Sequence, residues 1–257
     1  MELRGRGALV TGGGRGIGRA VALRLARAGA SVVTSARTRA EIEAVAGELR
    51  ADGARAVAVP ADVSRREDVQ ALFARAREAF GGVDILIVAA GIAPSATLTK
   101  TSDELWSSVL RVNLSGAFYC LREALPAMVE RAWGRVVMVA SIAGKTGVPY
   151  LAAYTASKHG LLGLTKAAAL EVADKGVTVN AVCPGYVDTP MTDVAVARIA
   201  ERTGRAPEDV RRRLEETSPQ KRMVTAEEVA GLALYLCSED ARGITGQGLS
   251  LDGGTLT

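Results

Sequence analysis

Three side chains near the middle of the chain have types and a spacing suited to proton transfer: Ser141, Tyr154 and Lys158. Tyr154 and Lys158 are four residues apart, so on a helix the phenol and the ammonium converge on one face. A phenol titrates near ~10, and a neighbouring cation lowers its pKa and makes it a usable acid and base. Ser141 follows the apolar run 136–140, where a strand should end, and could hold a substrate oxygen beside that phenol. The three residues favour a carbonyl or alcohol oxidoreductase.

A glycine-rich turn near the N-terminus has the form of a nucleotide-binding loop. An apolar strand pattern over 7–11 leads into the turn, and an apolar helix pattern over 19–26 follows it. Glycine lets the backbone approach a pyrophosphate, and the amides at the following helix start supply hydrogen bonds and positive partial charge. The spacing is Gly12-x-x-x-Gly16-x-Gly18, related to the common dinucleotide-binding register. A flexible loop is the alternative, but the flanking strand and helix argue against it.

The elements that must position these residues alternate along the chain as short apolar strands and helices, which is typical of a parallel sheet covered on both faces. Strands are predicted at 8–10, 32–35, 56–59, 85–89, 135–140, 178–182 and 249–251. Ligands of such sheets bind at the carboxyl ends of the strands, where the glycine turn, Asp62, Gly91, Ser141 and Pro184 all fall. We therefore expect an α/β protein: a Rossmann-type doubly wound parallel sheet of about seven strands with helices on both faces. It should form a single dinucleotide-binding and catalytic domain over residues 1–257.

Four segments have the form of capping boxes, in which a hydroxyl and a carboxylate satisfy free backbone amides at a helix start. They begin at Thr38, Ser64, Thr101 and Thr225, each with a glutamate three residues later. We interpret them as structural helix starts rather than active-site groups.

With these motifs in view, the chain resembles the short-chain dehydrogenase/reductase family from Leu3 to the Gly253-Gly254 pair. The resemblance implies a catalytic tetrad of Asn113, Ser141, Tyr154 and Lys158. It also implies a cofactor site formed by Gly12, Gly14, Arg15, Gly16, Ile17, Gly18, Arg37, Asp62, Val63, Ala90, Gly91, Tyr154, Lys158, Pro184, Gly185, Val187 and Thr189.

One position departs from the family pattern. Family members usually carry Asn-Ala-Gly after the fourth strand, whereas this chain has Ala89-Ala90-Gly91. In the family that asparagine helps to tie the central strands together near the adenosine. Its replacement by Ala89 bears on local rigidity and cofactor affinity and leaves the tetrad untouched.

The end of the second predicted strand indicates which dinucleotide is used. An acid there would accept hydrogen bonds from the ribose of NAD and repel a 2′-phosphate. Ala36 stands where the family's NAD-selective aspartate usually falls, and Arg37 offers a guanidinium suited to a phosphate. Arg15 in the glycine turn is a second cation. NADPH is therefore predicted over NADH, although both arginines could be merely exposed in an arginine-rich chain.

The resemblance implies a mechanism in which NADPH delivers hydride from its pro-S face to a ketone while Tyr154 protonates the developing alkoxide. Ser141 would bind the same oxygen, and Lys158 would bind the nicotinamide ribose and lower the Tyr154 pKa. Asn113 would support the water chain that restores the proton. Val187 and Thr189 would orient the carboxamide, with Asp188 between them as a loop residue rather than a base.

The substrate should be held by a helical lid at about 191–222 and by loops near 94–97, 142–150 and Tyr186. Arginines of the lid could meet the phosphates of coenzyme A or an acyl-carrier protein, but nearby acids offset most of that charge: Arg198, Arg202, Arg205 and Arg211–Arg213 against Asp193, Glu201, Glu208, Asp209, Glu215 and Glu216. The sequence around the tetrad is similar to reductases of 3-oxoacyl thioesters, including polyketide ketoreductases. A 3-oxoacyl thioester is therefore the first choice of substrate.

Two other functions stay open. One is an NAD-dependent secondary-alcohol or 3-hydroxy acid dehydrogenase of the same family, and the other is a non-catalytic dinucleotide-binding scaffold or sensor. The complete tetrad argues against the scaffold. The family also implies a homotetramer formed through two long helices near 106–128 and 152–175, whose apolar content permits it.

Composition excludes several other classes. The 257 residues are 48% hydrophobic, without an apolar secretory segment or a run approaching the ~18 apolar residues of a membrane span, so a cytoplasmic protein is expected. The three cysteines are far apart and His159 is the one histidine, so neither a disulfide framework nor a metal site is expected. The net charge of +4 is dispersed and aromatics are 4%, so no nucleic-acid partner is predicted.

Overall fold

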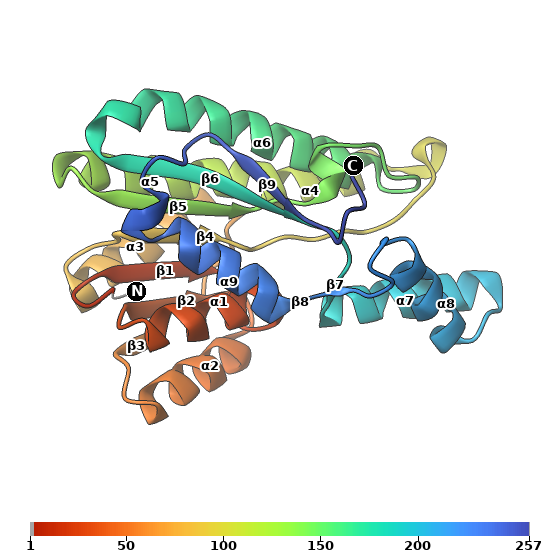
Figure 1. Ribbon diagram of the computed structural model, residues 1–257, viewed down its shortest axis with the longest axis horizontal. Coiled ribbons are helices and arrows are strands. Elements are labelled where there is room, and N and C mark those ends of the chain that lie inside the picture. The colour runs from red at the N-terminus through yellow and green to blue at the C-terminus, as the bar shows by residue number, and fades with distance from the viewer. Residues whose placement is uncertain (1–2, 257) are drawn as a thin grey trace.

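The computed structural model describes residues 3–256, and its centre is a seven-stranded, all-parallel sheet (Figure 1). In spatial order the strands are β3 (Ala56–Ala58), β2 (Ser31–Ser35), β1 (Gly7–Thr11), β4 (Ile85–Val88), β5 (Gly134–Val139), β6 (Val177–Pro184) and β9 (Gly248–Leu251). All seven predicted strands are present, and most of their ends lie within a residue of the prediction. The doubly wound α/β fold is confirmed.

Helices cover both faces of this sheet and complete two apolar cores (Figure 1). One face packs against α1 (Gly16–Arg27), α2 (Arg39–Ala51) and α9 (Ala226–Leu236). The other packs against α3 (Arg66–Phe80), α5 (Gly116–Glu130) and α6 (Ala152–Val172), with α4 (Asp103–Leu110) against α6. The central strands are buried along their whole length and apolar apart from Thr11 in β1 and Arg135 in β5, as expected for strands covered on both sides.

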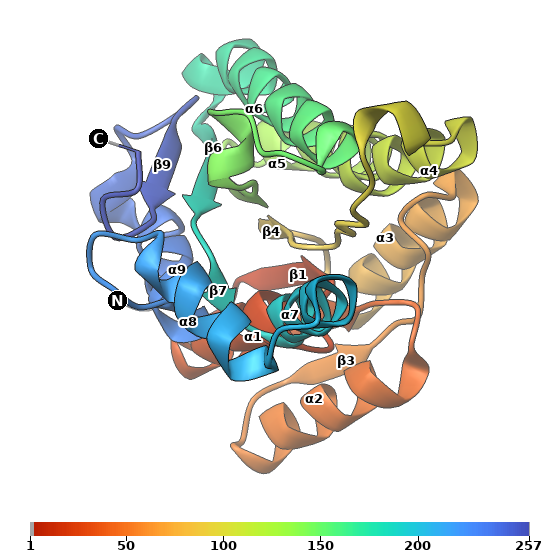
Figure 2. The ribbon, with the colours of Figure 1, turned by 90° about the vertical axis from the view of Figure 1, so that its right-hand side faces the viewer.

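The lid segment forms two helices, α7 (Pro190–Thr203) and α8 (Pro207–Glu216). They lie in front of the carboxyl edge of the sheet (Figure 2) and share a small apolar core of Val196, Ala200, Val210 and Leu214. Two short strands flank the lid and pair in parallel, β7 (Val187–Asp188) with β8 (Val224–Thr225). The sequence did not predict this pair, because two residues are too few to show a periodic pattern.

Only one of the four expected capping boxes forms. Thr225 caps α9, with its side chain and that of Glu228 exchanging hydrogen bonds with the backbone. The prediction is wrong for Thr101, because Ser102 caps α4 instead, and for Ser64, whose hydroxyl donates to Asp62 Oδ1 at 2.7 Å. It is also wrong for Thr38, because that hydroxyl makes no cap bond at α2.

The junction of β1 and β4, where the departure at Ala89 lies, is tied by a threonine. Thr11 Oγ1 accepts hydrogen bonds from the Ala89 amide at 3.2 Å and the Ala90 amide at 3.4 Å, and its own proton points to the Ile87 carbonyl at 3.4 Å. This side chain is fully buried. A hydroxyl of β1 therefore supplies a link between the central strands at the position where the family asparagine is missing.

Among residues 3–256, no helix has the length and apolar content to cross a bilayer.

Candidate active site

The order of the strands reverses direction between β1 and β4, and the predicted site residues collect at the carboxyl edge around this point. The glycine turn joins β1 to α1, Arg37 follows β2, and Asp62 and Val63 follow β3. Ala90 and Gly91 follow β4, and Ser141 follows β5. Pro184 ends β6, Val187 lies in β7 and Thr189 is the N-cap of α7. Ligands of open α/β sheets bind in this crevice, so the topology makes the proposed site spatially coherent.

Ser141 and Tyr154 meet at the end of β5. Ser141 caps a 3₁₀ turn and accepts the Ala143 amide at 3.1 Å, which fixes its hydroxyl. The Tyr154 phenol, on the first turn of α6, hydrogen-bonds with Ser141. Burial raises the pKa of Tyr154 above its ordinary value, and the hydrogen bond with Ser141 acts in the opposite direction. The phenol is therefore protonated at neutral pH.

Lys158 lies one turn further along α6 and is 4% exposed. Its Nζ donates to the Val139 carbonyl at 2.7 Å and lies 5.5 Å from the centre of the Tyr154 ring. Burial lowers the pKa of Lys158 to about 8. The pKa of Tyr154 is set by burial, which raises it, and by Ser141, which lowers it, so the lowering expected from Lys158 stays a prediction.

Asn113 lies in a short π-helical turn, Arg111–Ser115, between α4 and α5. Such turns are frequent at functional sites. Its amide nitrogen donates to the Ile92 carbonyl and to Ser157 Oγ, both at 3.0 Å, and its Oδ1 accepts the Ile92 amide at 2.9 Å. Both amide protons thus hold the segment after β4 against α6. This gives Asn113 a positioning role, and the water chain expected for it stays a prediction.

The glycine turn fits a dinucleotide pyrophosphate. Gly12 has a φ of +67°, and a Cβ there would lie 2.7 Å from the Ala90 nitrogen. A Cβ on Gly18 would lie 2.2 Å from the Gly12 carbonyl oxygen, so only glycine lets the turn close onto the start of α1. Beyond β4, a Cβ on Gly91 would lie 3.4 Å from Asn113 Oδ1 and 3.9 Å from Lys158 Nζ. The backbone therefore leaves room for a cofactor from the glycine turn to Lys158.

At the far end of this cradle, Asp62 and Arg37 lie close together. Burial acts to raise the pKa of Asp62, but hydrogen bonds from Ser64 and the nearby Arg37 guanidinium together lower it below its usual value. The guanidinium of Arg37 is exposed and free to meet an incoming anion. Val63 is buried and packs against Gly116, which holds this loop on α5.

Glu41 is a neighbour of the cofactor turn that the sequence did not identify. Arg15 Nη1 lies 3.6 Å from Glu41 Oε1, and a Cβ on Gly14 would touch the same carboxylate. Glu41 was expected to cap α2 with Thr38, and it instead faces the glycine turn. The carboxylate offsets part of the Arg15 charge, as Asp62 does for Arg37. In the sequence, the one sign of this contact is that Glu41 is the third residue of α2, a helix that begins close to the end of β2.

The nicotinamide-side loop runs from Pro184 to Thr189. A Cβ on Gly185 would lie 3.2 Å from the Asp252 Cα, so the loop passes close to the C-terminal segment. The Val187 carbonyl accepts Thr192 Oγ1 at 2.6 Å and Thr189 Oγ1 at 3.3 Å. Thr189 also packs against Gly16 of the glycine turn, at 3.4 Å from a Cβ built there. Thr189 thus joins this loop to the glycine turn.

The three cysteines are buried, in agreement with their interpretation as core thiols. Burial raises the pKa of Cys120 and of Cys237 to about 12, so both are unreactive thiols at neutral pH. Within residues 3–256, no group of three or more His, Cys, Asp or Glu side chains is placed to hold a metal ion.

Comparison with known proteins places this geometry in a family. A family model described as enoyl-(acyl carrier protein) reductase matches residues 12–256. D-beta-hydroxybutyrate dehydrogenase of Rhizobium meliloti (strain 1021) is 40% identical over 250 residues, which cover 96% of this chain and 97% of that protein. The 3-oxoacyl-[acyl-carrier-protein] reductase of Staphylococcus epidermidis (strain ATCC 35984) is 36% identical over 250 residues, 97% of this chain and 98% of that protein.

A solved structure has the same fold over nearly the whole chain. The crystal structure of a variant of actinorhodin polyketide ketoreductase with NADPH superposes with a TM-score of 0.94 at 39% identity and covers 97% of each chain. With the seven-stranded parallel sheet, the glycine turn and the Ser141–Tyr154–Lys158 arrangement, these matches identify the chain as a member of the short-chain dehydrogenase/reductase family of nicotinamide-dependent oxidoreductases.

Proposed function

We propose that this oxidoreductase uses NADPH to reduce the ketone of a 3-oxoacyl thioester to a secondary alcohol. The observation that carries the proposal is the convergence of Ser141, Tyr154 and Lys158 at the carboxyl edge of the sheet, with a protonated phenol hydrogen-bonded to a fixed serine. The names of a 3-oxoacyl reductase and a polyketide ketoreductase among its relatives support the substrate class.

The pKa of Tyr154 bears on its role as an acid. Reduction of a ketone needs a proton donor, whereas oxidation of an alcohol needs a base. Burial raises the pKa of Tyr154, so the phenol is available as a proton donor at neutral pH. The same group serves as the base when the reaction runs in reverse, so assays in both directions decide between a reductase and a secondary-alcohol dehydrogenase.

Each catalytic residue has one task in this proposal. The nicotinamide supplies the hydride when it is bound. Tyr154 Oη transfers its proton to the oxygen that gains charge, and Ser141 Oγ, held by the Ala143 amide, hydrogen-bonds the same oxygen. Lys158 keeps a positive charge beside the phenol at neutral pH, because its lowered pKa of about 8 still lies above 7. That charge stabilises the phenolate left after proton transfer.

The preference for NADPH rests on Arg37. It is exposed just after β2 next to Ala36, which stands in place of the family's NAD-selective aspartate, and its nearest acid is Asp62 of the neighbouring loop. The charge of Arg15 is offset in part by Glu41, 3.6 Å away. Arg37→Gln should therefore raise the KM for NADPH by about tenfold, the loss of one charge-assisted phosphate contact, and leave the KM for NADH unchanged. Arg39→Gln is the matched control, because Arg39 lies two residues away and faces Glu43.

An NAD-dependent 3-hydroxy acid dehydrogenase is the second candidate, and one observation favours it: a relative named D-beta-hydroxybutyrate dehydrogenase is 40% identical over nearly the whole chain. Nicotinamide absorbance separates the two functions. The purified protein is mixed with NADPH or NADH and acetoacetyl-CoA, with a simple cyclic ketone in parallel, and then with NAD⁺ and 3-hydroxybutyrate. Faster oxidation of NADPH with the thioester supports the proposal. Activity confined to NAD⁺ and 3-hydroxybutyrate, or to the cyclic ketone, overturns it.

A further inference from the structure

One arginine of the lid reaches out of its own helix to the loop that carries the nicotinamide-side residues. Arg211 of α8 is half-buried, and its two terminal nitrogens bind carboxylates on other elements: Nη2 bonds Asp188 of β7, and Nη1 bonds Asp193 of α7 at 3.0 Å. Its Nε also lies 3.7 Å from Glu215 within α8. An isolated exposed ion pair contributes little to stability, whereas one guanidinium shared by three carboxylates fixes several elements relative to one another.

Asp188 connects this network to the predicted cofactor site. Asp188 lies between Val187 and Thr189, and the Val187 carbonyl is bonded by Thr189 and Thr192. Thr189 packs against Gly16 of the glycine turn. Asp188 therefore connects α8 to the backbone of Val187 and Thr189, which lies against the glycine turn.

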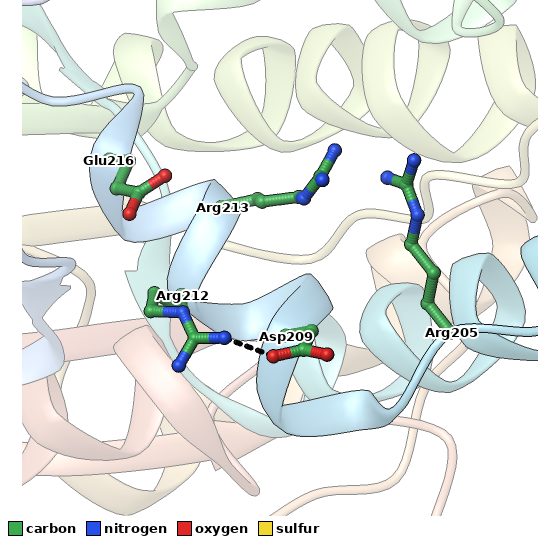
Figure 3. Close-up of a pocket in the computed structure, with 5 residues that line it drawn as sticks. All are labelled: Arg205, Asp209, Arg212, Arg213 and Glu216. Carbon is green, nitrogen blue, oxygen red and sulfur yellow. Dashed lines mark hydrogen bonds and ion pairs between the residues drawn. The ribbon is translucent and has the colours of Figure 1, made fainter.

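The neighbouring arginines do not share this role. Arg212 bonds Asp209 within α8, while Arg205 and Arg213 extend into a surface pocket lined by Asp209, Arg212 and Glu216 (Figure 3). The sequence places Arg211 with Arg212 and Arg213 among lid arginines whose charge is mostly offset by nearby acids, which is typical of a solvated helix face. The structure instead turns it away from that pocket, toward Asp188 and Asp193. Arg211 therefore links α8 to β7 and α7 and does not belong to a solvated helix face.

We propose that Arg211 is a positioning residue that couples the lid to the nicotinamide loop, so that cofactor binding at Val187 and Thr189 and closure of α7 and α8 stabilise each other. The proposal rests on the proposed function for the identity of the ligand, and on the Arg211–Asp188–Asp193 contacts for the coupling. Coupling between two binding equilibria is reciprocal, so a cofactor that stabilises the closed lid is itself bound more tightly when the lid is closed. Arg211 contributes part of this coupling free energy.

The test compares Arg211→Gln with Arg212→Gln, a matched control that removes the same charge from the adjacent position. Lid order is read as the rate of trypsin cleavage after Arg198, Arg202 and Arg205, with and without saturating NADPH, and NADPH affinity is read from its fluorescence. In the wild type and in Arg212→Gln, NADPH should slow cleavage by about tenfold. In Arg211→Gln the protection should fall below about twofold and NADPH should bind about fivefold more weakly, with an unchanged thermal midpoint.

A double-mutant cycle separates coupling from a general loss of packing. Asp188→Asn should reproduce much of the Arg211→Gln defect, and the double variant should be no worse than Arg211→Gln alone, because both remove one interaction. Equal protection in Arg211→Gln and Arg212→Gln, or additive effects in the cycle, would overturn the proposal. Both readouts work without turnover. The wild type could therefore fail to reduce acetoacetyl-CoA while the Arg211→Gln variant still loses the protection by NADPH. That result would contradict the proposed substrate and support the coupling.

Discussion

Lys158 is charged and nearly completely buried, and the burial of this charge lowers the free energy of unfolding. The protein gives its Nζ one carbonyl, that of Val139, at 2.7 Å. Burial lowers the pKa of Lys158 from 10.5 to about 8. A charged group held in this way stores unfavourable free energy that a catalytic site can use, because an ion pair formed on proton transfer from Tyr154 relieves it.

Lys158→Met should therefore stabilise the protein, and the gain should depend on pH. Below pH 8 both the folded and the unfolded wild type hold the proton, so the full penalty of about 3 kcal/mol applies. As the pH rises from 8 to 10.5 the folded state releases its proton first, and the wild type gains stability. The difference in urea unfolding free energy between Lys158→Met and the wild type should thus shrink over this range. A difference independent of pH would show that Lys158 is not desolvated.

At the scale of residues, the sequence predicts what depends on spacing along the chain. Tyr154 and Lys158 share a face because they are four apart, and Gly12 and Gly18 meet because the turn closes locally. The contacts of Glu41 with Arg15, and of Arg211 with Asp188, join different elements. No local pattern marks such pairs, so only the folded chain reveals them.

At the scale of elements, the strands were predictable because each is a short, continuous apolar run, and continuous burial is what a parallel sheet requires. Helix starts were less predictable. A serine or threonine three residues before a glutamate is common by chance, and the glutamate after Thr38 lies near Arg15 while the Thr38 hydroxyl makes no cap bond. The link between β1 and β4 was also missed, because the role of Thr11 appears only when Ala89 and Ala90 lie beside it.

Thr11→Val tests whether that threonine holds the central strands. Valine keeps the shape but removes the side-chain acceptor of the Ala89 and Ala90 amides, of which only Ala89 keeps the Thr11 carbonyl, so the free energy of unfolding should fall by about 1–2 kcal/mol. NADPH affinity should fall with it, because the same backbone lines the crevice. Thr178→Val is the control, since the buried Thr178 hydroxyl finds no partner within the described residues. That variant should be neutral or stabilising, and an equal loss in both would contradict the role of Thr11.

At the scale of the whole molecule, two helices that pack on one face of the sheet leave large apolar side chains on their outer surface. Leu170 of α6 is 81% exposed, and Phe118 of α5 is 43% exposed. Exposed apolar groups of this size are typical of protein interfaces. The homotetramer that the family resemblance implies stays a prediction, and it places these helices at the contacts between subunits.

Leu170→Arg should dissociate that tetramer, because it places four charges in an apolar interface related by symmetry. Sedimentation velocity should show the wild type as a tetramer and the variant as a smaller species. Val194→Arg on α7 is a matched control, since Val194 is 53% exposed and lies on the lid. A monomeric wild type, or a Leu170→Arg protein of unchanged size, would contradict the assembly.

The most direct test of the central claim, that Tyr154 donates the proton in an NADPH-dependent ketone reduction, is the turnover of acetoacetyl-CoA by Tyr154→Phe. The variant removes only the hydroxyl that hydrogen-bonds with Ser141. We predict that kcat falls by at least about 10²-fold, the usual contribution of a positioned acid, while NADPH binding measured by fluorescence is retained. Turnover that survives the substitution with NADPH still bound would contradict the claim.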